Sequence, residues 1–177
     1  MGLADSAPPS QLLNIRSGNG GVTDTLRLMA QIARSYKANP LIRQTAARIV
    51  RVCPGKDDLC EIGTLQSWVR SNIRYTGDVY ETETVQTPDY TLQERYGDCD
   101  DQAVLLATFL MAVGFQAGYC ALGTNGGPFS HVLAVAILRD GSQWPLETTV
   151  ECDLGTGQGI GPGWFPPDAT CVRFWHI

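Results

Sequence analysis

The chain lacks the features of proteins that bind nucleic acids or membranes. Its 13 Lys and Arg residues are outnumbered by 18 Asp and Glu residues, which gives a formal net charge of -5. Binding to a phosphate backbone needs a surplus of Lys and Arg on one face of a protein, and the composition offers none. The apolar runs are too short to span a bilayer. We therefore expect no nucleic-acid partner and no membrane partner.

The first residues also lack the basic segment and apolar run of a secretory signal peptide. We therefore expect synthesis in the cytoplasm, where thiols stay reduced. A bridge between Cys53 and Cys60, which bracket a Pro-Gly-Lys-Asp-Asp turn, is a minor alternative in an oxidising setting. Otherwise most of the six cysteines should be free: Cys53, Cys60, Cys99, Cys120, Cys152 and Cys171.

Metal-binding and phosphate-binding patterns are missing as well. No cysteine pair is spaced C-x-x-C, and neither histidine lies near a closely spaced cysteine pair, so the sequence predicts no structural zinc site. A glycine-rich run over 155–163 lacks the Lys-Ser/Thr ending of a phosphate loop. We expect no metal and no cofactor, and we interpret this run as a flexible cover or an assembly contact.

What the chain has is the composition of one globular domain. It contains 177 residues, of which 44% are hydrophobic and 18% charged, enough to build one core and too few for two ordinary domains. Residues 1–21 are rich in Ser, Gly, Pro and Asn and are predicted to form a loose N-terminal arm. Residues 22–177 are predicted to form a single domain.

Apolar spacing predicts helices in the first half and strands in the second. We expect helices from 22 to about 38, over 41–52 and over 58–73, followed by a long loop over 75–96. Residues 99–113 are apolar on nearly every side, which predicts a fully buried helix. Strands are expected over 116–123, 130–138, 142–150 and 172–177, with Asp140-Gly141 as a two-residue hairpin turn. The predicted fold class is α+β, with helices packed on a small antiparallel sheet.

Cys99 is the strongest candidate for a catalytic residue. It opens the buried helix, where backbone N–H groups lower a thiol pKa and face a developing oxyanion. Asp98, Asp100 and Asp101 oppose this effect, because nearby negative charge raises a thiol pKa. They are most simply helix-start carboxylates, with cation binding as the weaker alternative. A cysteine in an apolar segment is more often a buried small hydrophobe, and Cys120 fits that description.

His131 and Glu147 are the candidates for activating this thiol. His131 begins one expected strand, and the hairpin brings Glu147 alongside it on the next strand, where a carboxylate can orient the imidazole. The alternatives are a core histidine and an exposed strand glutamate. The other histidine, His176, lies at the terminus and is assigned no role.

Four sequence blocks follow one another in order. They are Tyr-Gly-Asp-Cys-Asp-Asp over 96–101, Gly-Phe-Gln-Ala over 114–117, Ser-His-Val over 130–132 and Trp-Pro-Leu-Glu-Thr-Thr over 144–149. Their order and local chemistry resemble the transglutaminase-like (papain-like) cysteine superfamily. A lead-in helix ending at 68–75 is also similar to that family, and the resemblance covers about residues 58–150. Compact bacterial and bacteriophage members share the Gly-Asp-Cys-Asp-Asp form.

The resemblance implies Cys99 as nucleophile, His131 as general base and acid, and Glu147 at a position where most relatives have Asp. An upstream oxyanion donor does not map cleanly, and Gln86 or Tyr80 are guesses. We therefore expect an enzyme that transfers acyl groups from a protein or peptide amide, including cell-wall peptide. Release to water is favoured over release to an amine, because the small domain gives no sign of excluding water. The alternative is a bacteriophage virion structural or assembly protein that keeps the fold, and an enzyme carried in a phage particle would satisfy both.

Overall fold

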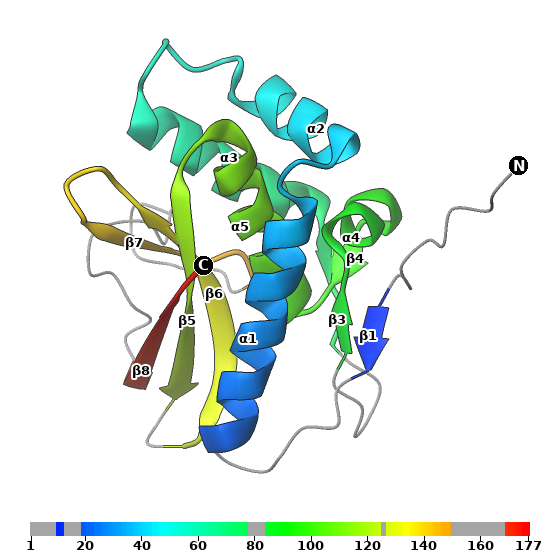
Figure 1. Cartoon of the computed structure of the whole chain (residues 1–177), viewed down its shortest axis with the longest axis vertical. Coiled ribbons are helices and arrows are strands. Elements are labelled where there is room, and N and C mark those ends of the chain that lie inside the picture. Colours follow the sequence, from blue (N-terminus) through cyan, green and yellow to red (C-terminus); the bar gives the residue numbers. More distant parts are fainter. Residues whose placement is uncertain (1–9, 13–18, 78–83, 125–126, 150–168) are drawn as a thin grey trace, which may run out of the picture.

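A computed structural model describes residues 10–12, 19–77, 84–124, 127–149 and 169–177. Helices cover one face of a four-stranded antiparallel sheet, with α5 (Cys99–Val113) packed between the sheet and the other helices (Figure 1). This is the α+β arrangement that the sequence predicts. No helix in the described ranges is both long and apolar enough to cross a membrane.

Three helices form the first half of the fold, as predicted. They are α1 (Asn19–Tyr36), α2 (Pro40–Val50) and α3 (Asp58–Asn72). The Asn39 side chain caps α2 by accepting hydrogen bonds from the first backbone N–H groups, and Asp57 caps α3 in the same way. Each helix turns an apolar stripe inward, so all three bury residues in the main core.

The predicted buried helix is confirmed as α5. Its positions from Asp100 to Leu110 are all buried. A reciprocal capping box joins Asp98 and Asp101 at its start, and Gly114 ends it with a φ of 106°, a left-handed conformation that suits glycine. Side-chain hydrogen bonds of Asp98 and Asp101 therefore fix the start of α5.

The sheet has the strand order β7-β6-β5-β8. Its strands are β5 (Gln116–Thr124), β6 (Phe129–Ile137), β7 (Gln143–Leu146) and β8 (Ala169–His176). The expected C-terminal edge strand is confirmed as β8, which pairs with β5. The strand expected over 142–150 is shorter than predicted, because β7 ends at Leu146.

The prediction of a two-residue hairpin turn at Asp140-Gly141 is wrong. The loop between β6 and β7 runs from Leu138 to Ser142, and the Leu138 backbone N–H donates to the Ser142 carbonyl. Gly141 takes a φ of 83° and donates back to the Leu138 carbonyl. The glycine does make the turn, but the strands stop pairing earlier than the sequence pattern indicates.

The prediction of a long loop over 75–96 is also wrong in part, because this segment includes regular elements. It contains β3 (Thr84–Gln86), α4 (Pro88–Glu94) and β4 (Tyr96–Gly97), and β2 (Arg74–Tyr75) pairs in parallel with β4. Pro88 stands at the first turn of α4, where its missing N–H has no cost, so it starts a helix here. Helix α4 is too short to show a clear apolar period.

The N-terminal segment is less loose than predicted. β1 (Ser10–Leu12) pairs antiparallel with β3, and α1 begins three residues before the expected Val22. The glycine-rich run over 155–163 lies outside the described residues, so its interpretation stays a prediction.

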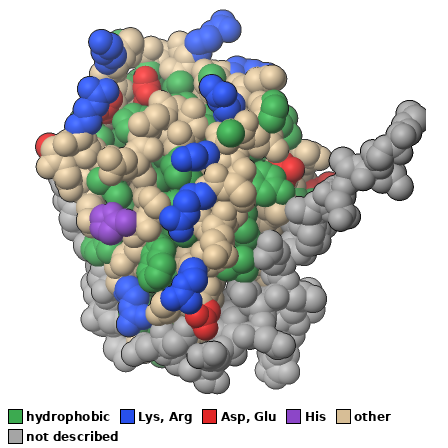
Figure 2. Space-filling model, in the orientation of Figure 1, with side chains coloured by type: hydrophobic (Ala, Val, Ile, Leu, Met, Phe, Trp, Pro, Cys, Tyr) green, Lys and Arg blue, Asp and Glu red, His purple; other side chains and the backbone are tan. Residues whose placement is uncertain are grey.

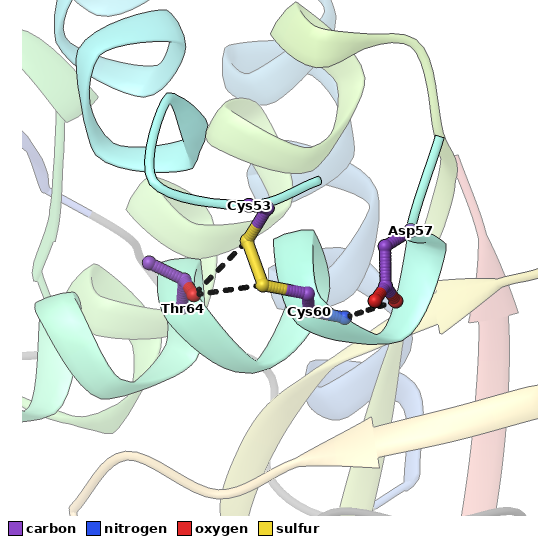
Figure 3. Close-up of a disulfide and its surroundings, with 4 residues drawn as sticks. All are labelled: Cys53, Asp57, Cys60 and Thr64. Carbon is purple, nitrogen blue, oxygen red and sulfur yellow. Dashed lines mark hydrogen bonds between the residues drawn. A yellow bond between two sulfur atoms is a disulfide. The ribbon is translucent and has the colours of Figure 1, made fainter. Parts of the chain in front are cut away.

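A disulfide joins Cys53, after α2, to Cys60 in the first turn of α3 (Figure 3). The Thr64 hydroxyl lies 3.4 Å from the Cys53 sulfur and 3.9 Å from the Cys60 sulfur. The bridge that the sequence leaves as a minor alternative is therefore formed. Cys99 and Cys120 are free, Cys152 lies outside the described residues, and the side chain of Cys171 is not described.

Candidate active site

Cys99 is the first residue of α5 and lies beside Val132 on strand β6. Its thiol donates to Asp100 Oδ1 at 3.5 Å. Burial raises the pKa of the Cys99 thiol well above its usual range, and the charges of Asp100 and Asp98 raise it further. A hydrogen bond from the Val132 backbone to the sulfur lowers it in part. The resting thiol is therefore neutral at physiological pH, and its proton has to be removed by a base.

His131 precedes Val132 on β6, and it lines the same pocket as Cys99. His131 Nε2 donates to Glu147 Oε2 at 2.7 Å. This bond places the ring proton on Nε2, so the neutral imidazole keeps an accepting lone pair on Nδ1. The structure thus brings together the three residues that the sequence predicts for the site.

Glu147 is fully buried and its carboxylate is held from two sides. Its Oε1 accepts the Thr149 backbone N–H at 2.7 Å and the Thr149 hydroxyl at 2.9 Å, while Oε2 faces His131. Burial raises the pKa of Glu147, but the hydrogen bonds and charge of His131 and the hydrogen bonds of Thr149 outweigh burial and hold that pKa below its usual value. Glu147 is therefore ionised at neutral pH, and the alternative of an exposed strand glutamate is wrong.

Gln66 fixes the backbone at the same point. Its Nε2 donates to the carbonyl of Glu147 at 2.8 Å, and the contact links α3 to the end of β7 across 81 residues of sequence. Gln66 is buried. Sequence reasoning missed both Gln66 and Thr149, because an isolated polar residue in a helix stripe carries no signal of which distant backbone group it meets.

A pocket of about 250 Å³ joins Cys99 and His131 to solvent. Helix α1 forms one wall through apolar side chains that include Leu26 and Met29, and Phe129 and Ala121 line the sheet side. Tyr75 also lines the pocket. The sequence gives no hint that α1, far from Cys99 along the chain, shapes this cavity.

The acidic residues around Cys99 have different environments. Asp101 is buried, and its Oδ1 accepts the Gln86 backbone N–H at 2.7 Å while its Oδ2 accepts the Asp98 backbone N–H at 3.2 Å. These contacts support the helix-start interpretation of Asp98 and Asp101. Only Asp98 and Asp100 line the pocket. Among the described residues, no group of three or more His, Cys, Asp or Glu side chains is arranged to hold a metal ion.

Of the two guesses for an upstream oxyanion donor, the structure argues against Gln86 and leaves Tyr80 a prediction. Gln86 is buried outside the pocket, and its Oε1 accepts from the Thr91 hydroxyl at 3.1 Å. Tyr80 lies outside the described residues. The pocket wall instead presents Tyr75, which ends the predicted lead-in helix segment in the sequence.

Cys120 is a useful contrast to Cys99. It is fully buried in a small apolar cluster with Leu122, Leu133 and Val135 on the sheet. Burial raises its pKa to about 12, and it does not line the pocket. The structure supports the interpretation of Cys120 as a packing residue.

The fold and this arrangement of cysteine, histidine and carboxylate define a transglutaminase-like, papain-like cysteine fold. The family model of the transglutaminase-like superfamily matches residues 43–169, and the chain belongs to this superfamily. Comparison with curated proteins gives no match.

Solved structures agree on the fold. A calcium-bound LapG from Legionella pneumophila is 15% identical with a TM-score of 0.57, covering 85% of this chain and 87% of that one. A candidate cysteine protease from Cytophaga hutchinsonii is 18% identical with a TM-score of 0.53, covering 79% of this chain. A candidate protease from Parabacteroides distasonis is 14% identical with a TM-score of 0.55, covering 71% of this chain.

The chain spans only 47% and 26% of the Cytophaga and Parabacteroides proteins. At 14–18% identity, the likeness to these structures shows the fold that the chain shares with them.

Proposed function

We propose that the chain hydrolyses an amide bond of a protein or peptide by cysteine-dependent acyl transfer, with Cys99 as nucleophile, His131 as general base and acid, and Glu147 as the residue that orients His131. The observation that carries this proposal is the 2.7 Å hydrogen bond to the buried Glu147 carboxylate from His131, which lines the same pocket as Cys99.

In the first step His131 Nδ1 accepts the proton of the Cys99 thiol as the sulfur attacks the carbonyl carbon of the amide. The carbonyl oxygen becomes an oxyanion, and backbone N–H groups at the head of α5 stabilise it. The C–N bond then breaks, and His131 gives its proton to the leaving amine. The acyl group remains on Cys99 as a thioester.

In the second step water replaces the amine. His131 takes a proton from the water, the resulting hydroxide attacks the thioester carbon, and the C–S bond breaks to release a carboxylic acid. The proton returns to the Cys99 thiolate. Glu147 stays ionised throughout and stabilises the imidazolium that forms in each step.

The raised pKa of Cys99 determines how the thiol is activated. Burial and the charges of Asp100 and Asp98 keep the resting thiol neutral, so deprotonation accompanies attack and no stable thiolate precedes it. Bound substrate displaces water from the pocket, so the Cys99 thiol then depends on His131 to accept its proton. Removing His131 should therefore abolish reactivity at neutral pH.

The substrate is proposed as a protein or peptide, with cell-wall peptide as one candidate. The pocket of about 250 Å³ holds a side chain and a short length of backbone. Val22 of α1 and Phe129 of β6 line it with half-buried apolar side chains, which favours an apolar or small side chain beside the scissile bond. The comparisons give no support to a role in a phage particle, and that alternative stays a prediction.

The proposal is tested by alkylating the protein with iodoacetamide, locating each adduct by mass spectrometry, and screening a peptide library for cleavage. Cys99 should react faster than Cys120, and His131→Ala should remove that difference. Cys99→Ala should lose all cleavage, whereas Cys120→Ala, the matched control, should retain it. Equal labelling of the two cysteines, or cleavage by Cys99→Ala, would refute the assignment.

A further inference from the structure

The positive charge of this acidic protein is concentrated in one stretch of the chain. Residues 19–56 contain seven Lys or Arg and a single acidic residue, Asp24, a formal net charge of +6 within a chain of net charge -5. The remaining residues therefore carry -11. The overall composition therefore hides a local surplus of Lys and Arg.

The fold gathers this charge on one surface. Five of the seven basic residues form what we call the basic face, and all five are exposed on α1, on α2 or just after them: Arg34, Lys37, Arg43, Arg48 and Arg51. Figure 2 shows Lys and Arg side chains in a column over the surface where Figure 1 places α1 and α2, with few acidic side chains among them.

Little in the described chain neutralises this charge. Asp24 is paired with Arg27 at 3.0 Å, outside the basic face. Within the residues that the structure describes, no carboxylate forms an ion pair with any member of the basic face. Exposed like charges repel one another unless an anionic partner or salt compensates them. The arrangement favours an external anion.

We propose that the basic face binds an acidic segment of a partner polypeptide. Four of the five residues are arginines, whose planar guanidinium groups bind carboxylates through two hydrogen bonds. This inference concerns binding on the outer side of α1 and α2, and it stands or falls independently of catalysis at Cys99.

The charge distribution favours a polypeptide over a larger polyanion. Charges act over about 8 Å at physiological ionic strength, so a short acidic segment lying on the basic face interacts with little of the acidic remainder. A membrane or a long duplex extends beyond this face and meets the rest of the chain, which carries -11. In addition, the only aromatic residue in residues 19–56 is Tyr36, which is half-buried, so this stretch offers no row of aromatic side chains to stack on successive unpaired bases.

Part of the basic face lies outside the match to the superfamily model. Arg34 and Lys37 lie before residue 43, where the match to the superfamily model begins. The same helix lines the pocket through Leu26 and Met29. A polypeptide held on the basic face is therefore held by a helix that also forms a wall of the proposed active site.

The test measures fluorescence anisotropy of a short labelled peptide of alternating Glu and Ser, with the Gln-Ser peptide as its uncharged control. The Glu peptide should bind more tightly, with an affinity that falls as salt rises. Arg43→Gln combined with Arg48→Gln should weaken binding by about fivefold or more. Arg43→Lys combined with Arg48→Lys keeps the charge and should retain most of the binding.

A matched control removes the same charge elsewhere. Arg74 and Arg139 are exposed on other elements, and their double change to Gln should leave binding within about twofold. Equal binding of the two peptides, or an equal loss in the two double variants, would overturn the proposal. Tighter binding to phosphatidylserine vesicles or duplex DNA than to the peptide would overturn it in favour of those partners. Self-association lost in the Arg43 and Arg48 variant would identify a second copy of the chain as the occupant.

Discussion

Replacing Glu147 with Gln tests the proposed site without knowledge of the substrate. The change keeps the shape and the volume of the side chain, and Thr149 can still donate to Oε1. The carboxamide NH₂, however, would face His131 Nε2, where both groups would be donors. The imidazole avoids two facing donors by carrying its proton on Nδ1 in place of Nε2. In that tautomer Nδ1 has no lone pair to accept the proton of Cys99.

The size of the effect follows from the bond that is lost. Hydrogen bonds to a charged group contribute about 1.5–3 kcal/mol, and each 1.36 kcal/mol is a factor of ten in rate. We therefore expect Glu147→Gln to slow alkylation of Cys99 at neutral pH by about 10- to 100-fold. Because alkylation is followed by mass, Cys120 in the same sample serves as an internal standard.

Glu94→Gln is the matched control, because Glu94 is exposed at the end of α4 and should leave the rate unchanged. Glu147→Asp keeps the charge but shortens the side chain, so an intermediate rate is expected. If Glu147→Gln alkylates within about twofold of the natural protein, the proposed orienting role of Glu147 is wrong.

The same variant predicts a pH dependence of stability. The folded-state pKa of Glu147 lies below its usual value of about 4.3. The resulting stabilisation is complete above the unfolded-state pKa and is lost as pH falls through the lower folded-state pKa. Urea unfolding should therefore show the natural protein more stable than Glu147→Gln at neutral pH, with a gap that narrows in acid. A gap that widens in acid would contradict the charge assigned to Glu147.

Three further predictions concern the surroundings of the site. Changing Cys53 and Cys60 together to Ser opens a loop with a sequence separation of 7 and should lower the free energy of unfolding by about 2.5 kcal/mol. Urea titration measures this difference, and adding a reductant should destabilise only the protein that has the disulfide. Gly97→Ala would place a Cβ 2.6 Å from the Asp101 Cβ and should destabilise the protein by about 1–3 kcal/mol, whereas an unchanged unfolding midpoint would show that Asp101 can move. Tyr75→Phe removes the phenolic hydroxyl from the pocket wall; if this hydroxyl assists the oxyanion, kcat for a cleaved peptide should fall by about tenfold or more with KM little changed.

Local signals in the sequence determine the head of α5. Asp98 and Asp101 stand three residues apart before an apolar run, and Gly114 follows that run, so capping, burial and termination can all be inferred from neighbours in the chain. The same holds for the helix caps at Asn39 and Asp57. These local signals therefore predict Cys99 at a helix start, where the structure has it.

Contacts between distant residues were decided only by the tertiary structure. The hydrogen bond from Gln66 to the Glu147 carbonyl spans 81 residues, and α1 reaches the pocket from far along the chain. The apolar pattern does not predict helix α4, because a helix of 7 residues is too short to show a clear period and depends on packing against α5. The disulfide likewise needed Cα atoms 5.7 Å apart, which spacing in sequence does not establish.

The sequence by itself determined the residue types and their order: a cysteine at a helix start, a histidine at a strand start and a glutamate after the following hairpin. It also contained the charge of residues 19–56, although only the packing of both α1 and α2 on α5 turned that charge into one exposed face. Burial, tautomer and pKa depend on which groups surround an atom in space. Those properties, and with them the proposed chemistry of Cys99, were decided by the tertiary structure.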